Sequence, residues 1–244
     1  MKHLVTIAAL AAVLAPPLAR ADQRYYGETY NASIAPKGAL DVELWSTLYQ
    51  PKSGHGPQSW VHQLELETGL TDHWDIALYN IFRYEQGDTT RYQATQVESR
   101  YRLSDPGEWF VDPVLYLELR KEWIEDKPWA VEEKLILGKD IDRLNLSVNL
   151  TAEQEFIPDG GGQELEYGYA AGASWELLPW LRAGGEAFGS WRHSTAEDHT
   201  ASQHYAGPAI SLAVARSWLV LAAGFGLTDE SDKLRARAIL AFQF

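Results

Sequence analysis

The strongest constraint on this chain is the alternation of apolar and polar residues in its last eleven residues, LRARAILAFQF. Every second position from Leu234 to Phe244 is apolar, whereas the positions between them include Arg235 and Arg237. Because successive side chains of a strand point to opposite faces, this pattern predicts a strand with one apolar and one basic face. Similar alternation runs through nearly all of the chain after residue 38, so we expect a fold made of strands.

The first 21 residues have the features of a cleaved secretory signal. Lys2 and His3 precede an apolar stretch that ends in Ala19-Arg20-Ala21, a small-residue cleavage pattern. The stretch is too short to span a membrane, and two prolines interrupt it. Cleavage would remove two basic residues and no acid, so the net charge would change from −13 to −15. A surplus of this sign argues against nucleic acid as a partner.

The rest of the sequence narrows the fold class. With no cysteine, the chain has no disulfide framework and no thiolate chemistry. The longest apolar run after the signal has ten residues, Trp218 to Leu227, about half of what a membrane helix needs. The alternation predicts twelve strands, most of them ten to thirteen residues long, at about 39–50, 58–70, 74–85, 91–103, 109–120, 129–138, 144–156, 165–177, 181–193, 204–216, 218–228 and 234–244.

The predicted connections alternate in length along the chain. Segments such as TDH, LP and the step at Arg216 are tight, whereas PKSGHGP, IPDGGGQ and HSTAEDHTASQ are longer and polar. Short turns at one end and longer loops at the other are typical of bacterial outer-membrane barrels. We therefore expect an all-β, antiparallel, up-and-down transmembrane barrel of twelve strands, rather than a soluble sandwich. An even strand number would place both termini in the periplasm, with outer-membrane lipids around the strands.

Aromatic residues collect at the ends of the predicted strands. Amphipathic rings favour the membrane interface, so two aromatic girdles are expected. The residues predicted for the first girdle follow the tight turns and are Trp74, Trp109, Trp180 and Trp218. Those predicted for the opposite girdle are Tyr49, Trp60, Tyr84, Tyr92, Trp129, Phe156, Trp191 and Tyr205.

Two parts of the sequence resemble known outer-membrane proteins. The stretches PKGALDVELWSTLY and QLELETGLTDHWDIALYN resemble an uncharacterised family of proteobacterial outer-membrane barrels, with a PKG-x4-E-x-W strand and a GLTD-x4-ALY hairpin. Similar barrels are described as putative transporters of aromatic-degradation operons. The terminal strand, with Phe242 and Phe244, resembles the signal that the barrel-assembly machinery recognises. The resemblance implies fold and location, and no catalytic residue.

The polar faces of the strands are expected to line the lumen. These candidates are Glu43, Glu65, Glu67, Asp75, Glu118, Arg120, Glu153, Glu155, Glu166, Arg182, Glu186, Arg192, Arg216, Arg235 and Arg237. An acidic arc from the first strands would adjoin a basic arc from the last four, across the seam where the barrel closes. Two interpretations remain open. The charges form a closed ion-pair network in a structural barrel, or they line a narrow channel for small polar or zwitterionic solutes.

Other activities have weaker support in the sequence. An outer-membrane acyl hydrolase would need a serine beside a histidine, and His193-Ser194 are adjacent residues that point to opposite faces of a strand. His193, His199 and His204 match no standard metal spacing, so no metal or cofactor is expected. The expected domains are the signal at 1–21, a periplasmic or plug segment at 22–38, and the barrel at 39–244.

Overall fold

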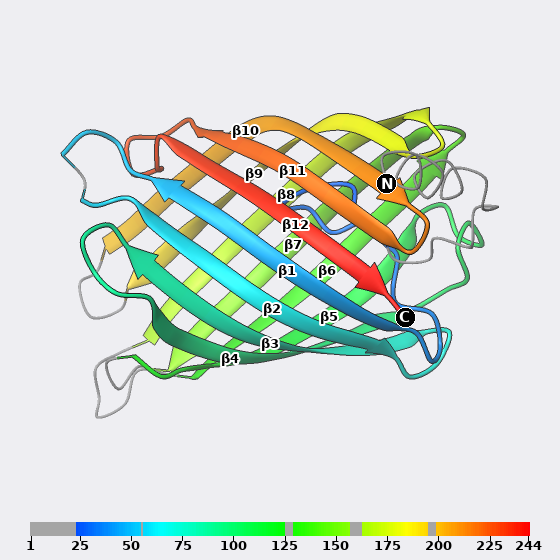
Figure 1. Ribbon diagram of the computed structural model, residues 1–244, viewed down its shortest axis with the longest axis horizontal. Helices are drawn as coiled ribbons and strands as arrows, with labels where there is room; N and C mark the ends of the chain where they lie inside the picture. The colour runs from blue at the N-terminus through cyan, green and yellow to red at the C-terminus, as the bar shows by residue number, and fades with distance from the viewer. Residues whose placement is uncertain (1–22, 55, 125–128, 157–162, 195–198) are drawn as a thin grey trace, which may run out of the picture.

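A computed structural model describes residues 23–54, 56–124, 129–156, 163–194 and 199–244, so the predicted signal at 1–21 lies outside the described residues. Twelve strands form the wall of the molecule (Figure 1). They are β1 (Leu40–Gln50), β2 (Ser59–Gly69), β3 (Trp74–Glu85), β4 (Arg91–Arg102), β5 (Asp112–Glu122), β6 (Trp129–Ile141), β7 (Leu144–Phe156), β8 (Gln163–Leu178), β9 (Leu181–Ser194), β10 (His199–Val214), β11 (Ser217–Gly226) and β12 (Leu234–Gln243).

The strands form one closed antiparallel barrel in which each strand pairs with its neighbours in sequence. The seam is the pairing of β1 with β12, which runs from Asp41 opposite Gln243 to Gln50 opposite Leu234. Closure leaves no free sheet edge, so the backbone N–H and C=O groups of every strand can pair with a neighbouring strand. A β-sheet needs such pairing wherever water cannot reach these groups. The prediction of a twelve-stranded all-β barrel is confirmed.

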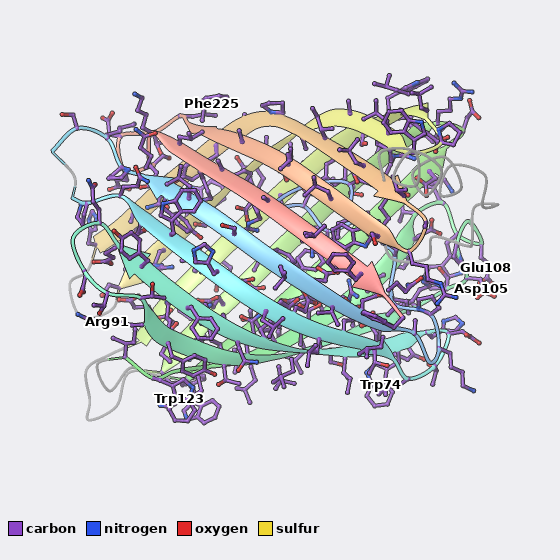
Figure 2. All side chains as sticks on the ribbon, in the orientation of Figure 1. Trp74, Arg91, Asp105, Glu108, Trp123 and Phe225 are labelled. Carbon is purple, nitrogen blue, oxygen red and sulfur yellow. The ribbon has the colours of Figure 1, made fainter. Side chains whose placement is uncertain are left out.

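The two faces of the wall differ as the alternation predicts. Apolar side chains project outward, and Leu44, Leu117 and Leu150 are 49%, 52% and 51% exposed. Trp74, Trp123 and Phe225 also point away from the barrel wall (Figure 2). The inward positions carry acids, arginines and a few apolar clusters, one of which joins Trp45, Trp218 and Ile239. Within the described ranges no helix has the length and apolar character needed to cross a membrane.

The two ends of the barrel have different connections. Three connections consist of two residues each, at 142–143, 179–180 and 215–216, and lie at the end where the chain terminates, called here the short-turn end (Figure 1). The opposite end is called the long-loop end. In two of these turns a residue other than glycine adopts the left-handed conformation, with φ of 54° at Asp142 and 53° at Ala215. Positive φ is what a two-residue hairpin turn requires.

The segment Gln23–Gly38, called here the internal segment, lies inside the barrel, where Figure 1 shows its blue trace between the strands. It touches Ser211 near the short-turn end, reaches Glu186 in the middle of β9, and returns to pair Lys37 with Gly69. The wall has glycines where the segment approaches it. A Cβ at Gly172 would stand 2.5 Å from the Tyr26 ring, and one at Gly138 would stand 2.6 Å from Ala32 Cβ.

Three strand boundaries differ from the prediction by three residues or more: the starts of β5 and β10, and the end of β6, which reaches Ile141 instead of residue 138. β5 begins at Asp112, so Trp109 belongs to the connection 103–111 and not to a strand. β10 begins at His199, five residues before the predicted start. Its first residues are polar and resemble a loop in sequence, but they continue the ladder with β9 as far as the pair His199 and Ser194.

Candidate functional site: the barrel interior

Glu186 anchors the internal segment in the middle of the barrel. Its carboxylate accepts hydrogen bonds from the backbone N–H groups of Gly27, Glu28 and Thr29, each at 2.9 Å. The Thr29 hydroxyl donates to the same carboxylate at 3.1 Å. Bonds to an ionised acceptor are about twice as strong as bonds between neutral groups, so one buried acid fixes three consecutive residues.

Asn149 of β7, two strands along the wall from Glu186, fixes the next residue of the segment. Its side-chain oxygen accepts from Tyr30 N at 2.6 Å, and its amide nitrogen donates to Tyr30 O at 2.9 Å. The Tyr30 hydroxyl donates to Glu98 at 3.3 Å. Burial, and then the neighbouring Glu98 carboxylate, raise the pKa of the Tyr30 phenol, which therefore stays protonated and remains a donor.

Arg237 holds the segment from the closing strand. Its guanidinium donates to Gly27 O and pairs with Glu28, both at 2.9 Å, and it donates to Thr47 of β1 at 2.9 Å. The side chain thus joins β12, β1 and the internal segment across the seam. Arg237 is part of the support of the segment.

The acids of β2 and β3 share a cation from β4. Arg100 pairs with Asp75 at 2.7 Å, with Glu98 at 3.3 Å and also with Glu67. All four side chains are nearly fully buried. Burial of unpaired carboxylates costs several kcal/mol each, so Arg100 is what permits this cluster. Glu43 accepts from Trp45 Nε1 at 2.9 Å, and Arg24 of the internal segment lies over the Trp45 and Tyr30 rings.

The wall from β5 to β9 carries more acids than cations in its long-loop half. We call this surface the acidic wall. Its cations, Arg120, Lys134 and Arg192, each pair with neighbouring carboxylates at 2.5–3.9 Å. The seven carboxylates of the wall are Glu118, Glu122, Glu132, Glu153, Glu155, Glu164 and Glu166. Seven acids against three cations leave a local negative charge that faces the lumen.

A cavity of about 160 Å³ lies between the internal segment and the long-loop end. Glu28 of the segment contributes to its lining. On one side it is lined by Glu132, Lys134 and Glu166, and on the other by Gln203, Tyr205 and Arg235. The cavity therefore joins the acidic wall to the closing strand.

The positions of the predicted lumen residues follow the register. Thirteen face the interior from strands: Glu43, Glu65, Glu67, Asp75, Glu118, Arg120, Glu153, Glu155, Glu166, Arg182, Glu186, Arg235 and Arg237. Arg192 lies at the rim, with half of its side chain exposed. Arg216 is different, because it belongs to the exposed turn between β10 and β11 and not to a strand.

The aromatic residues divide between the two faces. Trp74, Trp109 and Trp180 are exposed, at 41%, 50% and 46%. Trp218, expected beside them, points inward instead and packs on Trp45 and Ile239. One position along a strand reverses the face, and β11 begins at Ser217, so Trp218 falls on the lumen side. Tyr49 and Tyr205, expected in the opposite girdle, also face inward and surround Arg235.

Several interior residues were not singled out in the sequence, namely Arg24, Glu98, Arg100, Glu132 and Lys134. Gln96, Glu98 and Arg100 are alternate residues of β4 and therefore point to the same face of the strand. The alternation in the sequence thus contained enough information to place Glu98 and Arg100 in the lumen. Arg24 precedes the first strand, and no periodicity places it. The predicted basic and acidic arcs are therefore modified, because Arg24 and Arg100 supply positive charge beside the acids of β1–β3.

A serine and a histidine meet on the outward face near the long-loop end. Ser202 Oγ lies 2.9 Å from His204 Nε2, and Tyr169 OH lies 3.2 Å from His204 Nδ1. The His204 ring packs edge-on against Trp191. The sequence pointed instead to His193-Ser194, but His193 contacts Thr200. Among the described residues no three metal-binding side chains come close enough to share an ion, and 195–198 lie outside them.

Comparisons with known proteins establish the fold. No protein-family model matches the chain, and no curated protein matches its sequence. The chain is similar to the COG4313 outer membrane channel from Pseudomonas putida F1, with a TM-score of 0.65, 14% identity, and coverage of 86% of this chain and 96% of that chain. It is also similar to the NanC porin, with a TM-score of 0.56, 11% identity, and 84% and 98% coverage.

The KdgM porin, solved in complex with disordered oligogalacturonate, is a third similar structure, with a TM-score of 0.55, 10% identity, and 84% and 98% coverage. All three are barrels of the outer-membrane type. The chain therefore has the fold of an outer-membrane porin-like β-barrel.

Proposed function

We propose that the protein is a narrow outer-membrane channel for small polar solutes, whose lumen the internal segment constricts. The observation that carries this proposal is the cavity beneath the long-loop end, enclosed by a closed barrel and lined by charged side chains. The fold similarity to the COG4313 channel and to two porins supports it. The exposed apolar outer face would lie against outer-membrane lipids.

The acidic wall predicts that the channel prefers cations. A surplus of carboxylates concentrates cations near the lumen and repels anions. Glu132 and Glu133 provide a matched test, because they are adjacent on β6 but point to opposite faces. In planar bilayers, Glu132→Gln is expected to lower the K⁺ to Cl⁻ permeability ratio by about twofold, because it removes one lumenal charge. Glu133→Gln is the control and should leave the ratio unchanged.

The measurement also separates the channel from a closed structural barrel. Steady openings with a ratio that responds to Glu132→Gln support the channel. No current from protein that shows the heat-dependent gel mobility of a folded barrel would overturn it in favour of the structural barrel. Equal ratios for the two variants would contradict the role of the acidic wall.

Ser202 and His204 favour acyl hydrolysis as a second candidate function. With the proton of the imidazole on Nδ1, donated to Tyr169 OH, Nε2 can accept the Ser202 proton as Oγ attacks an ester carbonyl. The proton then passes to the leaving alcohol, and water releases the acyl group from Oγ. The expected result is labelling of Ser202 by a fluorophosphonate and hydrolysis of phospholipid that Ser202→Ala abolishes. Ser194→Ala is the control, and an unlabelled Ser202 would exclude this candidate.

A further inference from the structure

The two arginines of β12 have different environments. Arg237 donates to Thr47 and Gly27 and pairs with Glu28. Arg235 lies among three aromatic rings, 4.4 Å from the Tyr205 centroid, 5.0 Å from Tyr49 and 5.5 Å from Phe188. No carboxylate in the described part of the chain stands at ion-pair distance from it. The Arg235 guanidinium therefore packs on aromatic rings and, among the described residues, forms no ion pair.

The hydrogen bonds of Arg235 are also incomplete. One terminal nitrogen makes long contacts, 3.3 Å to Tyr205 OH and 3.5 Å to Gln203 Oε1. Its Nε is buried and has no hydrogen-bond partner among the described residues. A buried guanidinium without a carboxylate is costly, and aromatic faces offset only part of that cost. A ligand carboxylate is the group that completes such a site, because it accepts two parallel bonds from the planar fork.

The cavity places this arginine opposite the acidic wall. Arg235, Gln203 and Tyr205 line one side, and Glu132, Lys134 and Glu166 line the other, where two carboxylates stand against one ammonium. The Tyr205 ring is stacked on Phe188 at 5.0 Å and 16°, which keeps the tyrosine fixed beside the guanidinium. A simple anion would be attracted by Arg235 but repelled by the carboxylates. A simple cation would be attracted by the carboxylates but repelled by Arg235. A solute with both charges satisfies both sides.

We propose that this cavity is a binding site for a small zwitterion, with its carboxylate on Arg235 and its ammonium on the side of Glu132 and Glu166. The inference rests on the proposed channel function and names the substrate class of that channel. The Arg235 side selects the carboxylate by geometry, and the acidic wall selects the ammonium by charge. Arg237, committed to the internal segment, takes no part in binding.

The test is calorimetric titration of the complete mature chain, folded in detergent, with three probes that share a four-carbon chain: 4-aminobutyrate, butyrate and butylammonium. We expect 4-aminobutyrate to bind at least about tenfold more tightly than either of the others, because it alone satisfies both charged sides. Arg235→Gln should lower its affinity at least about tenfold, and Arg235→Lys should give a smaller loss because the charge remains without the fork. Glu132→Gln should weaken binding, and Glu133→Gln should not.

Three outcomes would overturn the inference. Butyrate binding as tightly as 4-aminobutyrate makes the site a simple anion site. Equal affinity in the wild type and both Arg235 variants removes Arg235 from binding. Absence of heat with all three probes, in protein that conducts in bilayers, rejects the zwitterion site while the channel stands. Binding in protein that never conducts would instead reject the channel and retain the site.

Discussion

At the scale of single residues, the interior is organised by a few buried groups that each satisfy several partners. Glu186 accepts three backbone N–H groups of the internal segment, and Arg100 serves three acids. Such groups are costly to bury alone and are stabilising only as complete sets. The sequence identified Glu186 as a lumen residue, but its role depends on a segment that is 157–159 residues away in the chain.

We expect Glu186→Gln to loosen the internal segment. The glutamine side chain has the same shape as glutamate but no charge, and its NH2 group would face the backbone N–H donors of the segment. The loss of charged hydrogen bonds is expected to cost about 1.5–3 kcal/mol of stability. Arg24, which is buried in the wild type, should then become cleavable by trypsin in the folded barrel, and bilayer conductance should increase. Glu176→Gln is the matched control, because Glu176 pairs with Arg182 near the rim and with no other cation among the described residues. Equal protection of Arg24 in both variants would show that Glu186 does not hold the segment.

At the scale of elements, alternation is a strong signal for the existence of strands and a weaker one for their ends. All twelve strands follow the predicted order. A barrel wall with an apolar outer face and a polar inner face requires apolar and polar residues to alternate along each strand, and this alternation is visible in the sequence. The start of β10 was missed because His199–Gln203 contain no large apolar side chain and yet continue the ladder. Trp218 was assigned to the wrong face because tryptophan suits both an interface and a buried cluster.

The turn between β10 and β11 contains a strained alanine. Ala215 has φ of 53°, a conformation that costs a residue with a Cβ about 1 kcal/mol relative to glycine. Ala215→Gly is therefore expected to raise the free energy of unfolding by about 1 kcal/mol, measured by urea titration of the folded barrel. Ala206→Gly, in the middle of β10, should have the opposite sign and cost about 0.5–1 kcal/mol. The same sign for both substitutions would contradict the strain.

At the scale of the whole molecule, the charge pattern of the lumen could be predicted only in part. The register gives the face of each charge, but pairing across strands requires the barrel to be closed and the internal segment to be in place. Arg24 and Arg100 lie beside acids that looked unpaired in the sequence, and the net negative charge is instead on β5–β9. The choice between a periplasmic and a plug segment had no periodic signal to decide it.

The orientation in the membrane can be tested because the chain has no cysteine. If the short turns face the periplasm, Ser53→Cys in the connection after β1 should react with a membrane-impermeant maleimide on intact cells. Glu108→Cys, exposed at the opposite end beside Asp105 (Figure 2), should react only after the outer membrane is opened. Ser53 and Glu108 are both exposed in the folded barrel, so a difference in labelling would not be caused by burial of one of the two positions. The reverse labelling pattern would invert the assigned orientation.

The seam between β1 and β12 has a consequence for the order of folding. Asp41 pairs with Gln243, and Gln23 reaches Ser211 across 188 residues of sequence, so the first residues are bonded to some of the last. Contacts of such separation form slowly, because a long loop must close before they contribute stability. The internal segment likewise bonds Asn149 and Glu186 from more than a hundred residues away. We therefore expect closure of the seam to be a slow step of folding.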